Sequence, residues 1–278
     1  MSTFKFTQVD VFTDQPLKGN PLAVVHGADA LSDEQMQAFA VWTNLSETTF
    51  LLQPTDPAAD YRVRIFTPNG ELPFAGHPTL GSCHAWQQAG GQPRARGIVV
   101  QQCKVGLVRI RATEQGAAFA APPLRMEAVD EGILSPVLKA LGLPREKVRA
   151  AQWLQNGPRW LTLLLDSVDT VLATEPDHAA LRSLAEVGLV APYPPGSPYQ
   201  FELRAFASPI GVPEDPVTGS LNAGVAQWLM DMGVAPTRYL ASQGQRLGRA
   251  GMVQIEHDGR TLWVGGRSVS CIQGELTL

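Results

Sequence analysis

Short stretches of alternating apolar and polar residues run through the first half of the chain, and this period of two predicts β-strands. The first stretch places Phe4, Phe6, Val9 and Val11 on a strand. β-Branched and aromatic residues predict another strand at residues 48–52. The predicted strands of this half are residues 4–12, 22–25, 48–52, 61–66, 98–102, 105–111 and 117–121.

Helical spacing is restricted to a few segments. In the first half, a capping box at Ser32 and Gln35 opens a helix that ends near Trp42, and a second helix spans residues 78–88. The second half repeats this mixture of elements. Its predicted helices are residues 133–141, 178–186 and 219–232, and its predicted strands are residues 160–165 and 201–206 with four more near residues 239, 253, 262 and 269.

This order of elements predicts an α+β fold. Most strands precede an antiparallel partner or a long helix, and regular βαβ units are absent from the pattern. We expect two halves, residues 1–124 and 125–278, in each of which a mixed sheet wraps a central helix. The last strand is expected to tie the halves together and is a candidate to cross to the N-terminal half.

A strand, a loop and a helix follow one another twice in the chain. The predicted strand 61–66 leads to Pro78–Ser82, and the strand 201–206 leads to Pro216–Ser220. Both segments read Pro-x-x-Gly-Ser, and proline favours the first position of a helix. We therefore predict that each helix opens at its proline and that both helix starts can bind an anion.

Composition and charge narrow the class of protein. The chain has 278 residues, of which 44% are hydrophobic and 17% are charged, as in ordinary globular proteins. Its net charge of −4 and the lack of basic runs argue against nucleic acid and membrane surfaces as partners. The start of the chain is not typical of a signal or transit peptide, and three widely spaced cysteines fit a reducing compartment, so a cytoplasmic location is expected.

Glu47 is the first candidate for chemistry. It lies between Leu45 and the apolar strand 48–52. A carboxyl group held against apolar surface has a raised pKa and can exchange protons near neutral pH. The alternative is a glutamate at a sheet edge that faces water, and position alone favours that alternative.

His77 is the second candidate. It follows Gly76, which lets the backbone approach a ligand, and it precedes Pro78. Its imidazole could bind a substrate or relay a proton, or it could merely bond to nearby backbone. The neighbouring glycine and proline favour the functional interpretation.

Asp215 and Ser220 are candidates at the second helix start. Asp215 could act in catalysis or could cap the helix, and both interpretations stay open. The hydroxyl group of Ser220 and the amides around Gly219 could bind a substrate carboxylate without a metal. A nucleophilic role for Ser220 is disfavoured, because the Gly-x-Ser-x-Gly pattern is missing.

Signals for cofactors are weak. His77 and His84 are seven residues apart without an acidic partner, which does not indicate a metal site. The glycine patterns of nucleotide-binding loops are absent. We therefore expect no metal and no cofactor.

Four motifs in order resemble the PhzF-like family, the phenazine-biosynthesis group of isomerases. They are Gly19–Val25, Asn44–Phe50, Phe74–Thr79 and Glu214–Ser220, and the resemblance covers nearly the whole chain. It implies the fold of diaminopimelate epimerase, in which two pseudo-symmetric halves each curl a sheet around a helix and the active site lies between them. It also implies a homodimer that uses no cofactor and acts on a small anionic substrate.

The resemblance assigns roles to single residues. It implies that Glu47 is the general acid/base, with His77, Asp215 and Ser220 beside it. It further implies that backbone groups of Gly76 and Gly219 hold the substrate carboxylate. The expected reaction is a proton shift in which Glu47 removes a proton from one carbon and returns a proton to another on the same face.

Two alternatives remain beside this hypothesis. One is a binding protein of the same fold that holds a carboxylate without catalysis. The other is an epimerase with two thiols, but the matching loops carry no cysteine and Cys83 is displaced into the helix. A smaller departure is Gly248–Gly251, which stands where relatives often have Gly-Arg-Pro-Ser.

Overall fold

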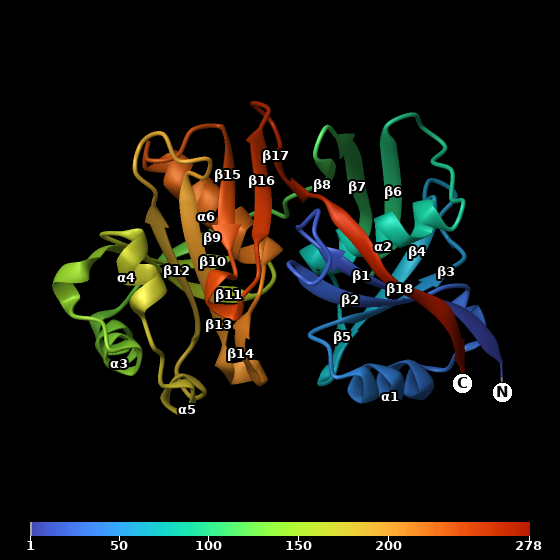
Figure 1. The fold of residues 1–278 in the computed structure, drawn as a ribbon, viewed down its shortest axis with the longest axis horizontal. Helices are drawn as coiled ribbons and strands as arrows, with labels where there is room; N and C mark the ends of the chain where they lie inside the picture. The colour runs from blue at the N-terminus through green and yellow to red at the C-terminus, as the bar shows by residue number, and fades with distance from the viewer. Residues whose placement is uncertain (1) are drawn as a thin grey trace. The chain divides into compact units, whose positions relative to one another are not determined.

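The computed structural model describes residues 2–278 and divides them into two compact units. Unit 1 consists of residues up to Ala120 together with Gly265–Leu278, and unit 2 consists of Ala121–Val264. Figure 1 shows both as mixtures of curved sheet and helix. The α+β class expected from the sequence is confirmed.

The main strands of unit 1 pair in the order β18-β1-β2-β3-β4-β6-β7-β8. Only the pairs β2–β3 and β4–β6 are parallel, and the short strand β5 forms a hairpin with β4. The strands are β1 (Thr3–Val11), β2 (Asn20–Val25), β3 (Thr48–Leu52), β4 (Tyr61–Thr67), β5 (Gly70–Leu72), β6 (Ile98–Cys103), β7 (Gly106–Thr113), β8 (Gly116–Ala120) and β18 (Ser268–Thr277).

Helix α2 (Gly76–Gln88) is the central helix of unit 1 and packs against strands from both ends of the sheet, including β1, β8 and β18. Its small residues permit this, since a Cβ atom on Gly81 would lie 2.6 Å from Leu22 Cδ2. Helix α1 (Asp33–Thr43) packs on β3 and β4, where Phe39, Phe50 and Phe66 form an aromatic cluster. The short helix η1 (Ala28–Ala30) precedes it.

The sheet of unit 2 follows the same plan in the order β9-β10-β11-β12-β13-β15-β16. Again two pairs are parallel, β11–β12 and β13–β15, and β14 forms a hairpin with β13. The strands are β9 (Arg125–Ala128), β10 (Val148–Gln155), β11 (Arg159–Leu165), β12 (Glu186–Pro192), β13 (Phe201–Ala207), β14 (Val212–Asp215), β15 (Arg238–Gln243) and β16 (Gly251–His257), and β17 (Leu262–Gly266) follows at the boundary with unit 1.

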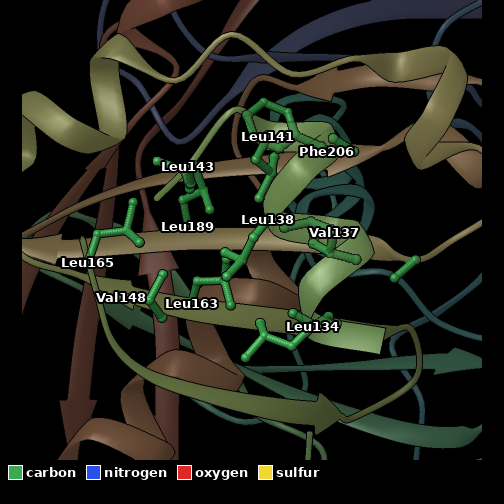
Figure 2. Packing of buried hydrophobic residues seen from close by; sticks show 14 of the residues in the cluster. Leu134, Val137, Leu138, Leu141, Leu143, Val148, Leu163, Leu165, Leu189 and Phe206 are labelled. Carbon is green, nitrogen blue, oxygen red and sulfur yellow. The ribbon is translucent and has the colours of Figure 1, made fainter. Parts of the chain in front are cut away.

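Helices cover both faces of this second sheet. Leu189 of β12 packs in the cluster drawn in Figure 2 with Leu138 of α3 (Glu131–Leu141). The neighbouring Gly188 points to the other face, where an added Cβ would lie 2.4 Å from Leu221 of α6 (Gly219–Asp231). The remaining helices of the unit are α4 (Val168–Ala173), α5 (His178–Leu181), η2 (Arg145–Lys147), η3 (Ser208–Ile210) and η4 (Gln245–Leu247).

Two predictions about the helices are wrong. The helix predicted for residues 178–186 ends at Leu181, and β12 begins at Glu186. The two prolines do not open their helices: α2 begins at Gly76, before Pro78, whereas α6 begins after Pro216, at Gly219, which is the start of the helix predicted for residues 219–232. The repeated Pro-x-x-Gly-Ser pattern therefore occupies different positions in the two helices, and the structurally matching residues are Gly76 and Gly219.

Candidate active site

Glu47 occupies the connection between α1 and β3, directly before the first residue of β3. Its side chain is 16% exposed, and its Oε2 atom is shielded from solvent. Loss of water raises the pKa of the Glu47 carboxyl group to about 7, although a hydrogen bond from Ser46 opposes the rise. Glu47 can therefore give and take a proton near neutral pH.

His77 is the second residue of α2, and its side chain is 5% exposed. Its Nε2 atom lies 3.6 Å from Glu47 Oε2, which is an ion-pair distance when the imidazole is protonated and too long for a hydrogen bond. The structure thus brings together two of the residues that the sequence proposed for catalysis.

A series of hydrogen bonds between buried side chains fixes the first turn of α2. Thr79 Oγ1 donates to the carbonyl of Ala75 at 2.9 Å, Gln101 Nε2 donates to Thr79 Oγ1 at 3.0 Å, and Tyr61 OH donates to Gln101 Oε1 at 2.9 Å. Ala75 at the N-cap offers no side-chain oxygen to the helix amides. The turn that carries Gly76 and His77 is therefore fixed, and no side chain of the N-cap residue occupies its amides.

In unit 2, Asp215 is the last residue of β14. Its Oδ2 atom accepts a hydrogen bond from Thr218 Oγ1 at 2.6 Å. Gln243 fixes the same turn: its Nε2 donates to the Asp215 carbonyl at 3.1 Å, and its Oε1 accepts from Thr218 N at 3.0 Å and from Asn222 Nδ2 at 2.9 Å. Asp215 thus belongs to a turn that is locked to the start of α6.

Gly219 and Ser220 are the first two residues of α6, so they match Gly76 and His77 of α2. Ser220 Oγ accepts a hydrogen bond from Trp160 Nε1 at 3.2 Å, and its carbonyl accepts one from Asn156 Nδ2 at 2.8 Å. An indole N–H cannot take up a proton, so Trp160 does not activate Ser220 as a nucleophile.

Two arginine–glutamate contacts, one in the hairpin before each central helix, were not predicted from the sequence. Arg64 of β4 donates two hydrogen bonds to Glu71 of β5, at 2.8 and 3.0 Å. Arg204 of β13 does the same to Glu214 of β14, at 3.0 and 2.8 Å. Each guanidinium also lies over the phenylalanine two residues later. The signal in the sequence is the repeated Arg-x-Phe of the two strands.

Thiol chemistry finds no support at Cys83. The thiol is buried in α2, and burial raises its pKa to about 12, so almost no thiolate forms near neutral pH.

His84 Nε2 lies 3.0 Å from Ser270 Oγ. Within residues 2–278, no group of three or more His, Cys, Asp or Glu side chains is arranged to hold a metal ion. The same residues include no helix with the length and hydrophobicity of a membrane-spanning segment.

Known proteins resemble this chain over its whole length. The sequence pattern of the family described as "Phenazine biosynthesis-like protein" matches residues 9–274. Antisense-enhancing sequence 1 of Schizosaccharomyces pombe is 35% identical, with 99% of each chain covered. The trans-2,3-dihydro-3-hydroxyanthranilate isomerase of Pseudomonas fluorescens is 32% identical, with 97% of this chain and 98% of the relative covered. The crystal structure of a PhzF-family phenazine biosynthesis protein from Bacillus anthracis superposes with a TM-score of 0.86 at 22% identity, with all of both chains covered.

Proposed function

Because the chain belongs to the family of phenazine biosynthesis-like proteins and has relatives named as isomerases, we propose that it shifts a proton within a small carboxylate-bearing substrate, with Glu47 as the general acid/base. One observation carries this proposal. Glu47 is a largely buried carboxyl group with a pKa of about 7, held 3.6 Å from His77 beside the start of α2.

The proposed reaction has two proton transfers. The Glu47 carboxylate removes a proton from a carbon next to a double bond, and the electron pair left behind spreads toward the substrate carboxylate. The protonated Glu47 then returns a proton to another carbon on the same face, so that the double bond moves and the carboxylate group of the enzyme is restored. A pKa near the working pH suits both steps, because neither form of the carboxyl group is costly to reach.

Backbone groups can assist this reaction. The amide of Gly76 lies at the positive end of α2, which favours a substrate carboxylate and the charge that grows beside it. A protonated His77 would stabilise the Glu47 carboxylate as an ion pair at 3.6 Å. We assign Asp215, Gly219 and Ser220 to substrate binding or proton relay on the basis of the family resemblance, and these roles stay predictions. The proposed chemistry uses proton transfer alone and no cofactor.

The substrate class follows from the relatives. A protein that is 32% identical is named for trans-2,3-dihydro-3-hydroxyanthranilate, a small cyclic carboxylate. We propose a substrate of this class, without assigning the chain to phenazine synthesis. The homodimer and the cytoplasmic location inferred from the sequence stay predictions.

The test is the substitution Glu47→Gln, which keeps the shape of the side chain and removes its acid/base function. With trans-2,3-dihydro-3-hydroxyanthranilate in deuterated buffer, the wild-type enzyme should form product and incorporate deuterium at carbon. The variant should lose about 10²- to 10⁴-fold of the rate, which is the usual contribution of a general acid/base. Product formation is followed by absorbance, and deuterium incorporation by NMR.

The same experiment separates the isomerase from a binding protein. Thermal stabilisation by the compound without deuterium incorporation in the wild-type protein would favour the binding function. A Glu47→Gln variant with wild-type turnover would remove Glu47 from the mechanism. Cys83→Ala serves as the control, because a thiol with a pKa of about 12 should not contribute and its loss should leave turnover unchanged.

A further inference from the structure

Ser82 ends the first Pro-x-x-Gly-Ser segment and has no role in the proposed reaction. It lies in the second turn of α2, and its side chain is fully buried. Serine is a weak helix former, because its hydroxyl group competes for nearby backbone carbonyls. Here the hydroxyl group donates to Thr49 Oγ1 of β3 at 2.9 Å, so it joins the helix to the sheet.

Thr49 is also fully buried, and the direction of its hydrogen bonds is fixed. Its Oγ1 atom accepts from Ser82 and donates to the carbonyl of Ala23 on β2 at 3.3 Å. Each hydroxyl group has one proton to donate, and here each proton has an assigned acceptor. Burying two hydroxyl groups is costly unless both are bonded, and an apolar pair would avoid that cost. The presence of a polar pair at this contact therefore indicates a role beyond packing.

The two hydroxyl residues lie close along the chain to the two residues of the candidate site. Glu47 precedes Thr49 by two residues, and His77 precedes Ser82 by five. Two residues of an extended chain and five residues of a helix both span about 7 Å. The Glu47–His77 contact and the Thr49–Ser82 hydrogen bond are therefore successive links between the start of β3 and α2.

Small residues let α2 approach the sheet closely but offer few side chains that interlock with it. A Cβ atom on Gly81 would lie 2.6 Å from Leu22 and 2.8 Å from Val11, so no side chain stands between helix and sheet at this point. Interlocking side chains normally fix the register of packed elements. Where they are missing, a buried and directional hydrogen bond can fix it instead.

We propose that the Ser82–Thr49 hydrogen bond fixes the position of α2 along β3 and thereby sets the distance between Glu47 and His77. Both hydroxyl residues are positioning residues, and only the turnover test below rests on the proposed function. At 3.6 Å the atoms of Glu47 and His77 are just beyond hydrogen-bond range, so a small displacement of α2 changes both their interaction and the access of water. A misplacement of about 1 Å can cost about 10²-fold in rate.

The first test is the titration of Glu47 in the folded protein, followed by carbon NMR of its carboxyl group and assigned with Glu47→Gln. Burial raises the pKa of this group to about 7. In Ser82→Ala and in Thr49→Val, water should reach the carboxyl group more easily, and the midpoint should fall by about 0.5–1 on the pH scale. A loss of global stability alone leaves the midpoint of the folded protein unchanged. Alanine favours a helix and valine keeps the β-branched shape, so both variants should fold.

Three further variants separate this contact from a general loosening of α2. Ser270→Ala removes a different partner of the helix, because Ser270 Oγ of β18 lies 3.0 Å from His84 Nε2, and it should keep the wild-type midpoint. Thr49→Ser retains the hydroxyl group and should keep it as well. The double variant of Ser82→Ala and Thr49→Val should shift the midpoint no further than either single variant, because all three remove the same bond.

The second test is turnover of trans-2,3-dihydro-3-hydroxyanthranilate. Ser82→Ala should lower kcat about tenfold and change KM by less than about twofold, because the residue places the acid/base and does not bind the substrate. Normal turnover by Glu47→Gln would remove the proposed base, and the titration of Glu47 would still decide whether the contact positions it.

Three results would overturn the positioning role. They are an unchanged midpoint in Ser82→Ala and Thr49→Val, an equal shift in Ser270→Ala, and an unchanged kcat in Ser82→Ala while Glu47→Gln is inactive. Should one of the two variants at the contact fail to fold, the other provides the same comparison.

Discussion

Glu47 shows how a single side chain acquires chemistry from its surroundings. The residue lies next to a strand that is almost entirely buried, and water does not reach Oε2. The charged form therefore loses hydration that the neutral form does not need, and the pKa rises from 4.5 to about 7. The burial that makes Glu47 a usable base also destabilises the folded protein when the carboxyl group is ionised.

This destabilisation predicts that the free energy of unfolding depends on pH. The pKa of Glu47 is higher in the folded state than in the unfolded state, so stability is lost as the pH rises from about 4.5 to about 7. A difference of this size corresponds to about 3 kcal/mol. Glu47→Gln should therefore be more stable than the wild type by up to about 3 kcal/mol at pH 8.

Urea unfolding of both proteins at pH 4 and pH 8 measures this difference. At pH 4 both side chains are neutral in the folded protein, so the two free energies of unfolding should nearly coincide. An equal difference between the proteins at the two pH values would contradict the burial of the charge. The contributions of other titrating groups cancel in this difference, because both proteins contain the same groups.

The sequence could identify Glu47 only through its motif. Its position before an apolar strand is equally compatible with a side chain in water, since burial depends on residues distant in the chain. His77 was easier to predict, because Gly76 and Pro78 restrict the backbone around it.

At the scale of elements, the sequence predicted a helix up to residue 186 and no strand for β12, and it also missed β9 and β10. The run Val187–Ala191 is apolar and completely buried, and it follows a true helix start at His178. A short buried strand of a parallel pair lacks alternation, so periodicity cannot distinguish it from the end of a buried helix. Strands with one exposed face, such as β6 and β7, were predicted to within about two residues because alternation was visible.

The two arginine–glutamate pairs allow a matched prediction about elements. Arg204 and Glu214 are 3% and 8% exposed, whereas Arg64 and Glu71 are 16% and 21% exposed. Removing one partner of a buried pair leaves the other charge without compensation, which costs about 3–5 kcal/mol. The more exposed pair is partly screened by water, and its loss costs about 1 kcal/mol.

We therefore expect Glu214→Gln to lower the free energy of unfolding by about 3 kcal/mol and Glu71→Gln by about 1 kcal/mol. Chemical denaturation at pH 7 measures both values. The substitution is the same in both hairpins, and the remaining partners act in the same direction as burial: Arg64 keeps the Asp33 carboxylate, whereas Arg204 keeps the backbone carbonyls of Val171 and Thr174. Equal losses would show that burial does not distinguish the two pairs.

At the scale of the whole molecule, each unit has the same order of pairings. From β18 to β7 and from β9 to β16, the neighbouring pairs are in turn antiparallel, antiparallel, parallel, antiparallel, parallel and antiparallel. A hairpin precedes each central helix. The pseudo-symmetric α+β fold was predicted from the resemblance, and the fold is confirmed. Propensities alone did not reveal the symmetry, because the two halves carry different side chains on one backbone plan.

The division of the chain predicts different behaviour for two fragments. Residues 121–264 contain every strand of the sheet from β9 to β16 and the core of Figure 2, so they should unfold cooperatively in urea. Residues 1–120 lack β18, which pairs with β1 from Thr3 to Val11, and should not unfold cooperatively. Circular dichroism measures both transitions.

Adding residues 265–278 as a peptide should restore the cooperative transition of the first fragment. A cooperative transition of residues 1–120 without that peptide would show that β18 is dispensable.

The three thiols differ in a way that has a practical consequence. Cys83 and Cys103 are buried, and burial raises the pKa of both, whereas Cys271 lies half-exposed on β18. A maleimide dye applied to the native protein will therefore label position 271 first. Such a dye reports on the strand that returns to unit 1, so its fluorescence follows the detachment of that strand.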